Sequence, residues 1–278
     1  MRPLPLALLA ALALAPGCSG APAPEHPNVI LISLDAVRAD HTGFLGYERD
    51  TTPNLDRLAE ESISFTRAYA TAPMTLVSHM GMMTGLRQSR NGVDKDQALS
   101  PDIPTLAERL AAIGYDTVAL FFKGWIHERF GYDRGFRVFQ PHPDWRGAAA
   151  HMEEHFAQPT TEPFFLFLHL FDAHSADLRK RGSTMYETPA PFDTMFQADA
   201  TDVLAAAAAQ GMTAHALWNG GMKATPEVIE AATALYDGAI ANLDHQVGAW
   251  LDRFAQQGIL DNSIVIVTAD HGESLGQR

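Results

Sequence analysis

The sequence predicts an α/β fold in which a mostly parallel sheet is sandwiched between helices. Two observations predict it: short apolar runs alternate with amphipathic stretches, and the connections between them are brief. Of the 278 residues, 46% are hydrophobic and 19% are charged, a composition that can build a large core. The formal net charge of −13 argues against nucleic acid as a partner, because binding to a phosphate backbone requires a basic face.

Four apolar runs have the length and composition of buried strands. In order along the chain they lie at Asn28–Leu34 (NVILISL), 117–122 (TVALFF), 164–171 (FFLFLHLF) and 264–268 (IVIVT). Each is rich in β-branched or aromatic residues and lacks the alternation of a half-exposed strand, so we expect both faces of the sheet to be covered.

Helices are expected between these strands. Thr52 and Pro53 read as an N-cap and a first helical residue before an amphipathic segment. A second helix is predicted over 103–113. A long amphipathic helix is predicted over 227–257, and Gly258 would end it.

The N-terminal segment reads as a targeting signal. Residues 1–18 resemble a bacterial lipoprotein signal peptide with a lipobox that ends at Cys18, and 19–27 form a Pro/Ala-rich tether. We therefore expect an exported protein of the bacterial cell envelope, attached to the membrane by a lipid on Cys18. The alternative is an ordinary cleaved signal with an incidental thiol. Cys18 is the single cysteine, which excludes an intramolecular disulfide.

The remaining residues, 28–278, are expected to form one domain. Within it, about 175–226 is poorly patterned apart from an alanine-rich helix near 205–209, and we interpret it as an insertion or lid.

Polar side chains follow every predicted strand. In parallel sheets ligands bind at the carboxyl ends of strands, so these residues are the first candidates for a site. They are Asp35, Lys123, Asp172, His174, Asp270 and His271.

Asp35 and Asp270 are the strongest candidates for a metal site. Two carboxylates in a poorly hydrated crevice repel each other, and an idealised Born penalty of about 20 kcal/mol per ion favours a bound cation. The nitrogen of His271 favours Zn²⁺ or Mn²⁺ over Ca²⁺ or Mg²⁺, which remain possible. Taken singly, Asp35 is equally a helix cap, and Asp270 and His271 a polar turn.

Three long segments resemble the sulfatase family, of the alkaline-phosphatase-like superfamily. They are NVILISLDAVRADHTGFLGY, TTPNLDRLAEESISFTRAYATAPMTLVSHMGMMTGL and YDGAIANLDHQVGAWLDRFAQQGILDNSIVIVTADHGESLG. The resemblance runs from about residue 28 to 276 and implies a metal-dependent hydrolase of sulfate or phosphate esters. It also implies that the chain holds the N-terminal catalytic portion and is C-terminally truncated relative to the family.

The residue at the nucleophile position departs from the sulfatase pattern. Sulfatases carry C/S-x-P-S/A-R, whose first residue becomes formylglycine, whereas the matching stretch here begins at Thr75 and ends at His79. The resemblance then turns to superfamily phosphodiesterases and phosphoethanolamine or phosphoglycerol transferases, in which an unmodified Thr attacks phosphorus. A helix N-cap is the alternative role for Thr75.

The implied metal ligands are Asp35, Thr75, Asp270 and His271. Ala36 stands where sulfatases usually have a second Asp, which agrees with a transition metal rather than Ca²⁺.

Three further residues are catalytic candidates through the same resemblance. Lys123 would neutralise charge on the transferring group, with an exposed surface lysine as the alternative. His174 would bind an oxygen or protonate the leaving group, and His79 would orient Thr75 or contact the substrate. His169, inside an apolar strand, is expected to be a core histidine.

The leading functional hypothesis is a hydrolase of anionic esters with Thr75 as its metal-activated nucleophile. A transferase or phosphodiesterase is the alternative within the enzyme class. A truncated or degenerate lipoprotein without activity is the alternative outside it.

Overall fold

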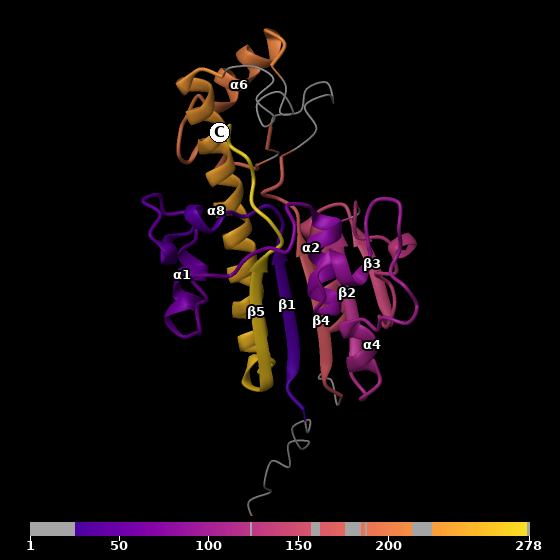
Figure 1. The fold of residues 1–278 in the computed structure, drawn as a ribbon. Helices are drawn as coiled ribbons and strands as arrows, with labels where there is room; N and C mark the ends of the chain where they lie inside the picture. Colours follow the sequence, from indigo (N-terminus) through magenta and orange to yellow (C-terminus); the bar gives the residue numbers. More distant parts are fainter. Residues whose placement is uncertain are drawn as a thin grey trace, which may run out of the picture.

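The computed structural model describes residues 26–122, 124–156, 162–175, 185–186, 188–212 and 224–276. Within these residues one five-stranded sheet has the order β3-β2-β4-β1-β5, and every neighbouring pair is parallel (Figure 1). The strands are β1 (Asn28–Leu34), β2 (Asp116–Phe122), β3 (Val138–His142), β4 (Phe164–Leu170) and β5 (Ser263–Ala269). The predicted parallel α/β sheet is confirmed. The edge strand β3 was not predicted, because it is only partly buried and lacks a continuous apolar run.

Helices connect the strands and cover both faces of the sheet. They are α1 (Pro53–Glu60), α2 (Thr75–Thr84), α3 (Gln88–Asn91), α4 (Leu106–Ala111), α5 (Trp145–His155), α6 (Ala200–Ala209) and α8 (Pro226–Gln256). Short 3₁₀ helices lie at Ala39–His41, Gly43–Leu45, Glu128–Phe130, Phe192–Thr194 and Leu260–Asn262. Helix α4 is shorter than predicted because it begins at a capping box, in which Thr105 and Glu108 each satisfy the other's backbone N–H.

Alternation along the strands divides the core into two layers. Ile30 and Ile32 of β1 pack on the side of the sheet that α8 covers, with Leu235 of that helix in the same cluster. Leu31 of β1 and Phe167 of β4 face the other side, where α2 lies. Figure 1 shows these two helices on opposite faces of the sheet. Strands buried on both faces explain the continuous apolar runs in the sequence.

The α2 side of the sheet becomes polar toward the carboxyl ends of the strands. Leu31 is followed by Ser33 on the same face of β1, and Phe167 is followed by His169 on β4. Ser33 and His169 are register partners, and both are buried. Asp35 continues this face one step beyond β1. The sheet therefore places polar side chains beneath the end of α2.

Helix α8 fixes the loop that follows β1. Asp237 is fully buried in this helix and accepts hydrogen bonds from His41 at 2.6 Å, Tyr47 at 2.6 Å and Arg49 at 2.7 Å. Three donors from one loop satisfy a carboxylate that would otherwise be costly to bury. The chain that leaves Asp35 is thus tied to the helix.

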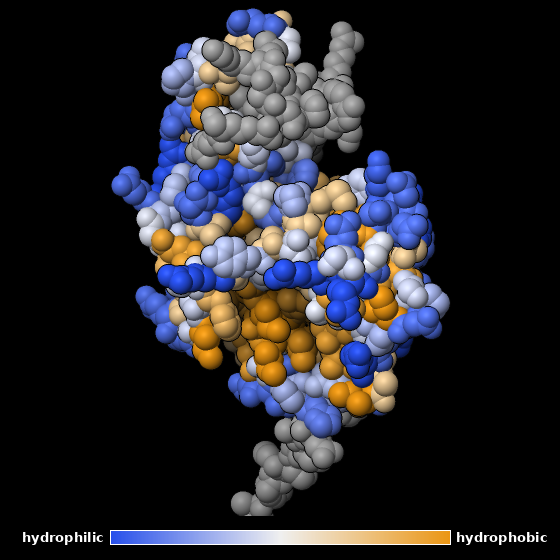
Figure 2. Space-filling model, viewed as in Figure 1, coloured by the Kyte–Doolittle hydropathy of each residue, from blue (hydrophilic) through white to orange (hydrophobic). Residues whose placement is uncertain are grey.

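Strand β5 forms an edge of the sheet and is the least covered strand. Its Ile264 and Ile266 are 50% and 43% exposed, on the side opposite α8. Figure 2 shows an apolar hollow on the viewed face, below the loop that crosses the sheet in front of β1 and β5.

The predicted terminal segment and insertion are only partly described. Residues 1–25 lie outside the described residues, so the signal peptide, Cys18 and most of the tether stay predictions. Within 175–226 the described parts lie beyond the carboxyl ends of the strands, and α6, the predicted alanine-rich helix, packs on α8 (Figure 1). None of the described helices combines the length and the apolar character needed to cross a membrane.

Candidate metal centre and active site

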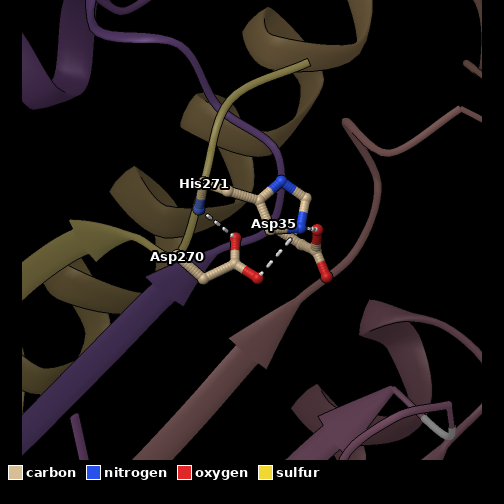
Figure 3. A group of neighbouring side chains, drawn as sticks. All are labelled: Asp35, Asp270 and His271. Atoms are coloured by element: carbon tan, nitrogen blue, oxygen red, sulfur yellow. Dashed lines mark hydrogen bonds and ion pairs between the residues drawn. The ribbon is translucent and has the colours of Figure 1, made fainter. Parts of the chain in front are cut away.

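Asp35, Asp270 and His271 meet at the carboxyl ends of two neighbouring strands. Leu34 and Ala269 are register partners at the last positions of β1 and β5, so the next residue of each strand enters the same crevice. One ligand atom from each of the three side chains lies within 4.8 Å of the others. Figure 3 shows the three side chains turned toward one another. Two residues 235 positions apart in sequence are brought together by strand pairing alone.

Each carboxylate has one oxygen that is hydrogen-bonded and one that is not. Asp35 Oδ2 accepts from His169 Nε2 at 2.9 Å and from the Thr75 hydroxyl at 3.3 Å. Asp270 Oδ1 accepts from the backbone N–H of Ala36 at 3.1 Å and of His271 at 2.8 Å. The other oxygens, Asp35 Oδ1 and Asp270 Oδ2, are buried and have no hydrogen-bond partner among the described residues.

The imidazole of His271 completes the set. Its Nδ1 lies 2.9 Å from the carbonyl oxygen of Gly272 and must donate to it, which leaves Nε2 as a bare acceptor. Nε2 lies 3.7 Å from Asp35 Oδ1 and 3.4 Å from Asp270 Oδ2, the two unpartnered oxygens. These three acceptor atoms face one another, and a divalent metal ion would satisfy all three at once, so these residues fit such an ion.

The protonation preferences of the two aspartates diverge. Burial opposes ionisation of Asp35, but the hydrogen bond and charge of His169, with His174 and His271 nearby, bring the pKa of that carboxyl below its usual value. Burial and the neighbouring charge of Asp35 raise the pKa of Asp270. Without a cation, Asp270 is therefore the carboxylate that resists ionisation.

Thr75 is the first residue of α2 and lies against this cluster. Its side-chain oxygen is 3.3 Å from Asp35 Oδ2 and 3.2 Å from His271 Nε2, and the residue is 5% exposed. Met74, not Thr75, occupies the N-cap, and no side chain caps the helix there. The helix N-terminus points at the site, where its unpaired N–H groups favour an anion.

The four predicted metal ligands are thus brought together, whereas other carboxylates nearby are not. Asp40 is paired with Arg38 at 2.7 Å, and its side chain is exposed. Ala36, at the position of the second sulfatase aspartate, is buried with a φ of 61°, in the left-handed region.

His79 lies beneath the site rather than at its surface. It is 0% exposed, and its Nδ1 is 3.0 Å from the carbonyl oxygen of Thr75 and 3.4 Å from Asp270 Oδ2. Its Nε2 is 2.8 Å from the Ser33 hydroxyl. Burial, with the neighbouring His169, lowers the pKa of His79 to about 3, so the ring is neutral. Of its two predicted roles, orienting Thr75 fits this position and direct substrate contact does not.

His174 borders the site, and Lys123 lies outside the described residues. The His174 ring stacks on Phe171 with centroids 4.3 Å apart and lies 6.2 Å from the His271 ring. Its Nδ1 is 2.9 Å from the carbonyl oxygen of Ser175, which leaves Nε2 as the nitrogen that can face a ligand. Asp172 turns to the other side, toward Gln246 of α8 at 3.3 Å.

His169 is the residue whose contact with the site the sequence did not reveal. It is buried, as expected of a core histidine, but its ring donates to Asp35. The available signal was alternation: His169 shares a strand face with Phe165 and Phe167, and that face leads to the strand ends.

Comparisons with known proteins agree with this architecture. An arylsulfatase of Clostridium perfringens is 25% identical over 319 residues, which cover 91% of this chain and 64% of the relative. A steryl-sulfatase of Mus musculus is 34% identical over 137 residues, 43% of this chain and 22% of the relative. This chain therefore spans less than two thirds of the length of these relatives.

Solved structures share the fold. The phosphonate monoester hydrolase of Agrobacterium radiobacter has a TM-score of 0.70 at 20% identity, covering 91% of this chain and 64% of that one. The C-terminal periplasmic domain of EcEptC from Escherichia coli, in complex with Zn, has a TM-score of 0.61 at 18% identity, covering 90% and 65%.

A family model matches nearly the whole described domain. The model described as Sulfatase matches residues 27–278, and so includes β1, α2 and β5, the elements that carry the metal cluster and Thr75. The chain belongs to the sulfatase family, within the alkaline-phosphatase-like superfamily.

Proposed function

We propose that this protein is a metal-dependent hydrolase of sulfate or phosphate esters in which Thr75 is the nucleophile. One observation carries the proposal: the Thr75 hydroxyl lies 3.3 Å from Asp35 and 3.2 Å from His271, inside a cluster whose unpartnered acceptors fit a cation. A threonine hydroxyl is a weak nucleophile, and acceptors or a metal ion beside it are what would activate it.

The donor set favours Zn²⁺ or Mn²⁺. Asp35, Asp270, Thr75 and His271 offer three oxygens and one nitrogen, a mixture that suits a transition metal better than Ca²⁺ or Mg²⁺. The zinc in the similar EcEptC structure is consistent with this choice. When bound, such an ion lowers the pKa of a coordinated hydroxyl and offsets negative charge on the ester.

The residues divide the reaction into two displacements. Thr75 Oγ forms a bond to sulfur or phosphorus while the bond from that atom to the leaving oxygen breaks. The hydroxyl proton passes to Asp35 Oδ2, its hydrogen-bond acceptor, and His174, protonated on both ring nitrogens, gives its Nε2 proton to the leaving oxygen. The α2 N-terminus faces the non-bridging oxygens. Water then attacks the same sulfur or phosphorus and gives a proton to His174, while the bond to Thr75 Oγ breaks and that oxygen regains its proton from Asp35.

Sulfate and phosphate esters are both supported by the comparisons. The curated relatives are sulfatases, and the Agrobacterium radiobacter structure is a phosphonate monoester hydrolase. Thr75 cannot supply the formylglycine of sulfatases, which favours phosphorus chemistry. An acceptor alcohol in place of water would make the same intermediate serve a transferase.

The lipobox-like sequence that ends at Cys18 supports attachment of the enzyme to a membrane of the bacterial cell envelope. Membrane fractionation tests this point: wild-type protein should sediment with membranes, and Cys18→Ala protein should not. Equal distribution of the two would exclude the lipid anchor.

Activity is tested with nitrophenyl sulfate, nitrophenyl phosphate and bis-nitrophenyl phosphate, with added Zn²⁺ or Mn²⁺. We expect metal-dependent turnover of at least one ester and its loss in Thr75→Ala. Thr84→Ala is the matched control, because Thr84 ends the same helix and bonds the Met80 carbonyl oxygen, away from the cluster. Activity that survives Thr75→Ala excludes this mechanism, and a folded, metal-loaded protein without any turnover would favour a non-catalytic lipoprotein.

A further inference from the structure

We infer that His169 is a positioning residue that holds Asp35 with one oxygen turned toward the metal ion, and so sets the metal affinity of the site. The inference rests on the metal site of the proposed function, but it concerns binding rather than turnover. His169 belongs to none of the motifs that carry the family resemblance.

The His169 ring lies in apolar surroundings. His169 follows Phe165 and Phe167 on the α2 face of β4, and all three are at most 4% exposed. An imidazole in such surroundings needs hydrogen bonds to offset its lost hydration. Within the part of the chain that the structure describes, the ring bonds Asp35, and its buried Nδ1 has no partner. Since one nitrogen is left unsatisfied, packing alone does not explain a histidine here.

The hydrogen bond between His169 and Asp35 has a defined direction. A carboxylate that binds a metal ion has no proton and can only accept, so His169 Nε2, 2.9 Å from Asp35 Oδ2, must be the donor. The proton therefore resides on Nε2, and the bare nitrogen is Nδ1. This assignment agrees with the surroundings of Nδ1, where the described residues offer no acceptor for an N–H.

This hydrogen bond fixes the orientation of the Asp35 carboxylate. With Oδ2 bonded to His169, the carboxylate cannot rotate freely, and Oδ1 is the oxygen left facing Asp270 and His271. Bonds of this kind from a neighbouring side chain orient metal ligands, and their loss typically weakens metal binding about 10–100-fold.

The His169 ring is itself held in place by its neighbours. The His79 ring packs edge-on against the His169 ring, with centroids 4.9 Å apart and an 84° angle between planes. His79 is itself fixed by Ser33 on β1 and by the Thr75 carbonyl oxygen. His169 is therefore held, through His79, by residues of β1 and α2, and it is not itself within the metal-ligating group found among the described residues.

The experiment compares two amide substitutions in the full chain. His169→Gln places an amide N–H near the position of Nε2, whereas His169→Asn carries the same amide one bond closer to the backbone, too short to reach Asp35. Zn²⁺ affinity is measured by competition with a chromophoric chelator, and the visible spectrum of the Co²⁺-loaded protein reports ligand geometry. Thermal unfolding in EDTA checks that both variants fold.

We expect His169→Asn to bind Zn²⁺ about 10–100-fold more weakly than wild type, with an altered Co²⁺ spectrum, and His169→Gln to recover most of the affinity. Equal affinities in wild type and His169→Asn would overturn the inference. So would equal losses in the two variants, or a wild-type protein that binds no Zn²⁺. If wild type binds Zn²⁺ and the amide variants differ as expected but no ester is hydrolysed, the proposed function fails and the inference stands.

Discussion

The hydroxyl of Tyr236 donates to the carbonyl oxygen of Ala36 at 2.7 Å and accepts the backbone N–H of Arg38 at 2.8 Å. Ala36 has a φ of 61°, a conformation that costs a non-glycine residue about 1–3 kcal/mol and persists only where its surroundings enforce it. Ala36 directly follows Asp35, and the N–H of Ala36 donates to Asp270. The Tyr236 side chain on α8 therefore secures the turn that follows Asp35 and connects it to Asp270.

Tyr236→Phe should loosen this turn. Loss of both hydrogen bonds leaves two backbone groups without their partner, and we expect the free energy of unfolding to fall by about 1–3 kcal/mol. Zn²⁺ affinity should fall as well, because Asp35 and Asp270 lose their fixed separation. Urea unfolding and chelator competition measure the two effects.

Tyr115→Phe is the matched control for this substitution. The Tyr115 hydroxyl also bonds a backbone carbonyl, that of Pro27 at 2.8 Å, at the other end of β1. It should lower stability without changing Zn²⁺ affinity. An equal change in affinity from the two variants would contradict a specific role for Tyr236.

Asp270→Asn should separate stability from metal binding. Burial and the charge of Asp35 raise the pKa of Asp270, so its ionised form destabilises the metal-free fold at every pH above its usual value. The amide keeps the oxygen that accepts from Ala36 and removes the charge. We therefore expect the metal-free variant to melt at a higher temperature than metal-free wild type.

Added metal should then act on wild type alone. Zn²⁺ at about 100 times its Kd stabilises a folded protein by about 2.7 kcal/mol, and EDTA reverses it. Asp270→Asn should show almost none of this gain, whereas Asp40→Asn, at an exposed carboxylate, should show all of it. Thermal unfolding with Zn²⁺ or EDTA measures each case, and a full Zn²⁺ response in Asp270→Asn would exclude Asp270 as a ligand.

The acid side of the stability curve should depend on Asp116. Hydrogen bonds from Arg137, at 2.5 and 2.8 Å, hold the pKa of Asp116 below its usual value, although partial burial opposes this. Because the folded-state pKa is the lower one, the contribution to stability is complete above the usual pKa, near 4. It is lost as the pH falls through the folded-state pKa.

Urea unfolding between about pH 6 and pH 3 tests this assignment. Wild type should lose more stability over this range than Asp116→Asn. Arg137→Gln should flatten the curve to a smaller extent, because it removes one cation but leaves His155, whose Nε2 lies 3.2 Å from Asp116 Oδ2. Parallel curves for wild type and Asp116→Asn would show that the pair makes no difference to the pH dependence.

Much of this architecture was predictable from the sequence because the signals are local. A strand buried on both faces needs a continuous apolar run, and β1, β2 and β4 each have one. Strand β5 has such a run as well, but the expectation that both its faces are covered was wrong, because Ile264 and Ile266 are exposed on this edge strand. The edge strand β3 includes Pro141 and is only partly buried, so it carried no such signal. The long helix α8 was predicted to within one residue at each end because its amphipathic pattern is continuous and Gly258 follows it.

The sequence by itself determined the sheet, the strand ends and the identity of Asp35, Thr75, Asp270 and His271 as the residues to examine. Only the tertiary structure decided which oxygen of each aspartate is free, that His169 bonds Asp35, and that Tyr236 fixes Ala36. The physical reason is directionality. Apolar burial leaves a periodic trace in the sequence, whereas a hydrogen bond between His169 and Asp35, 134 residues apart, depends on strand register and ring orientation that no local pattern records.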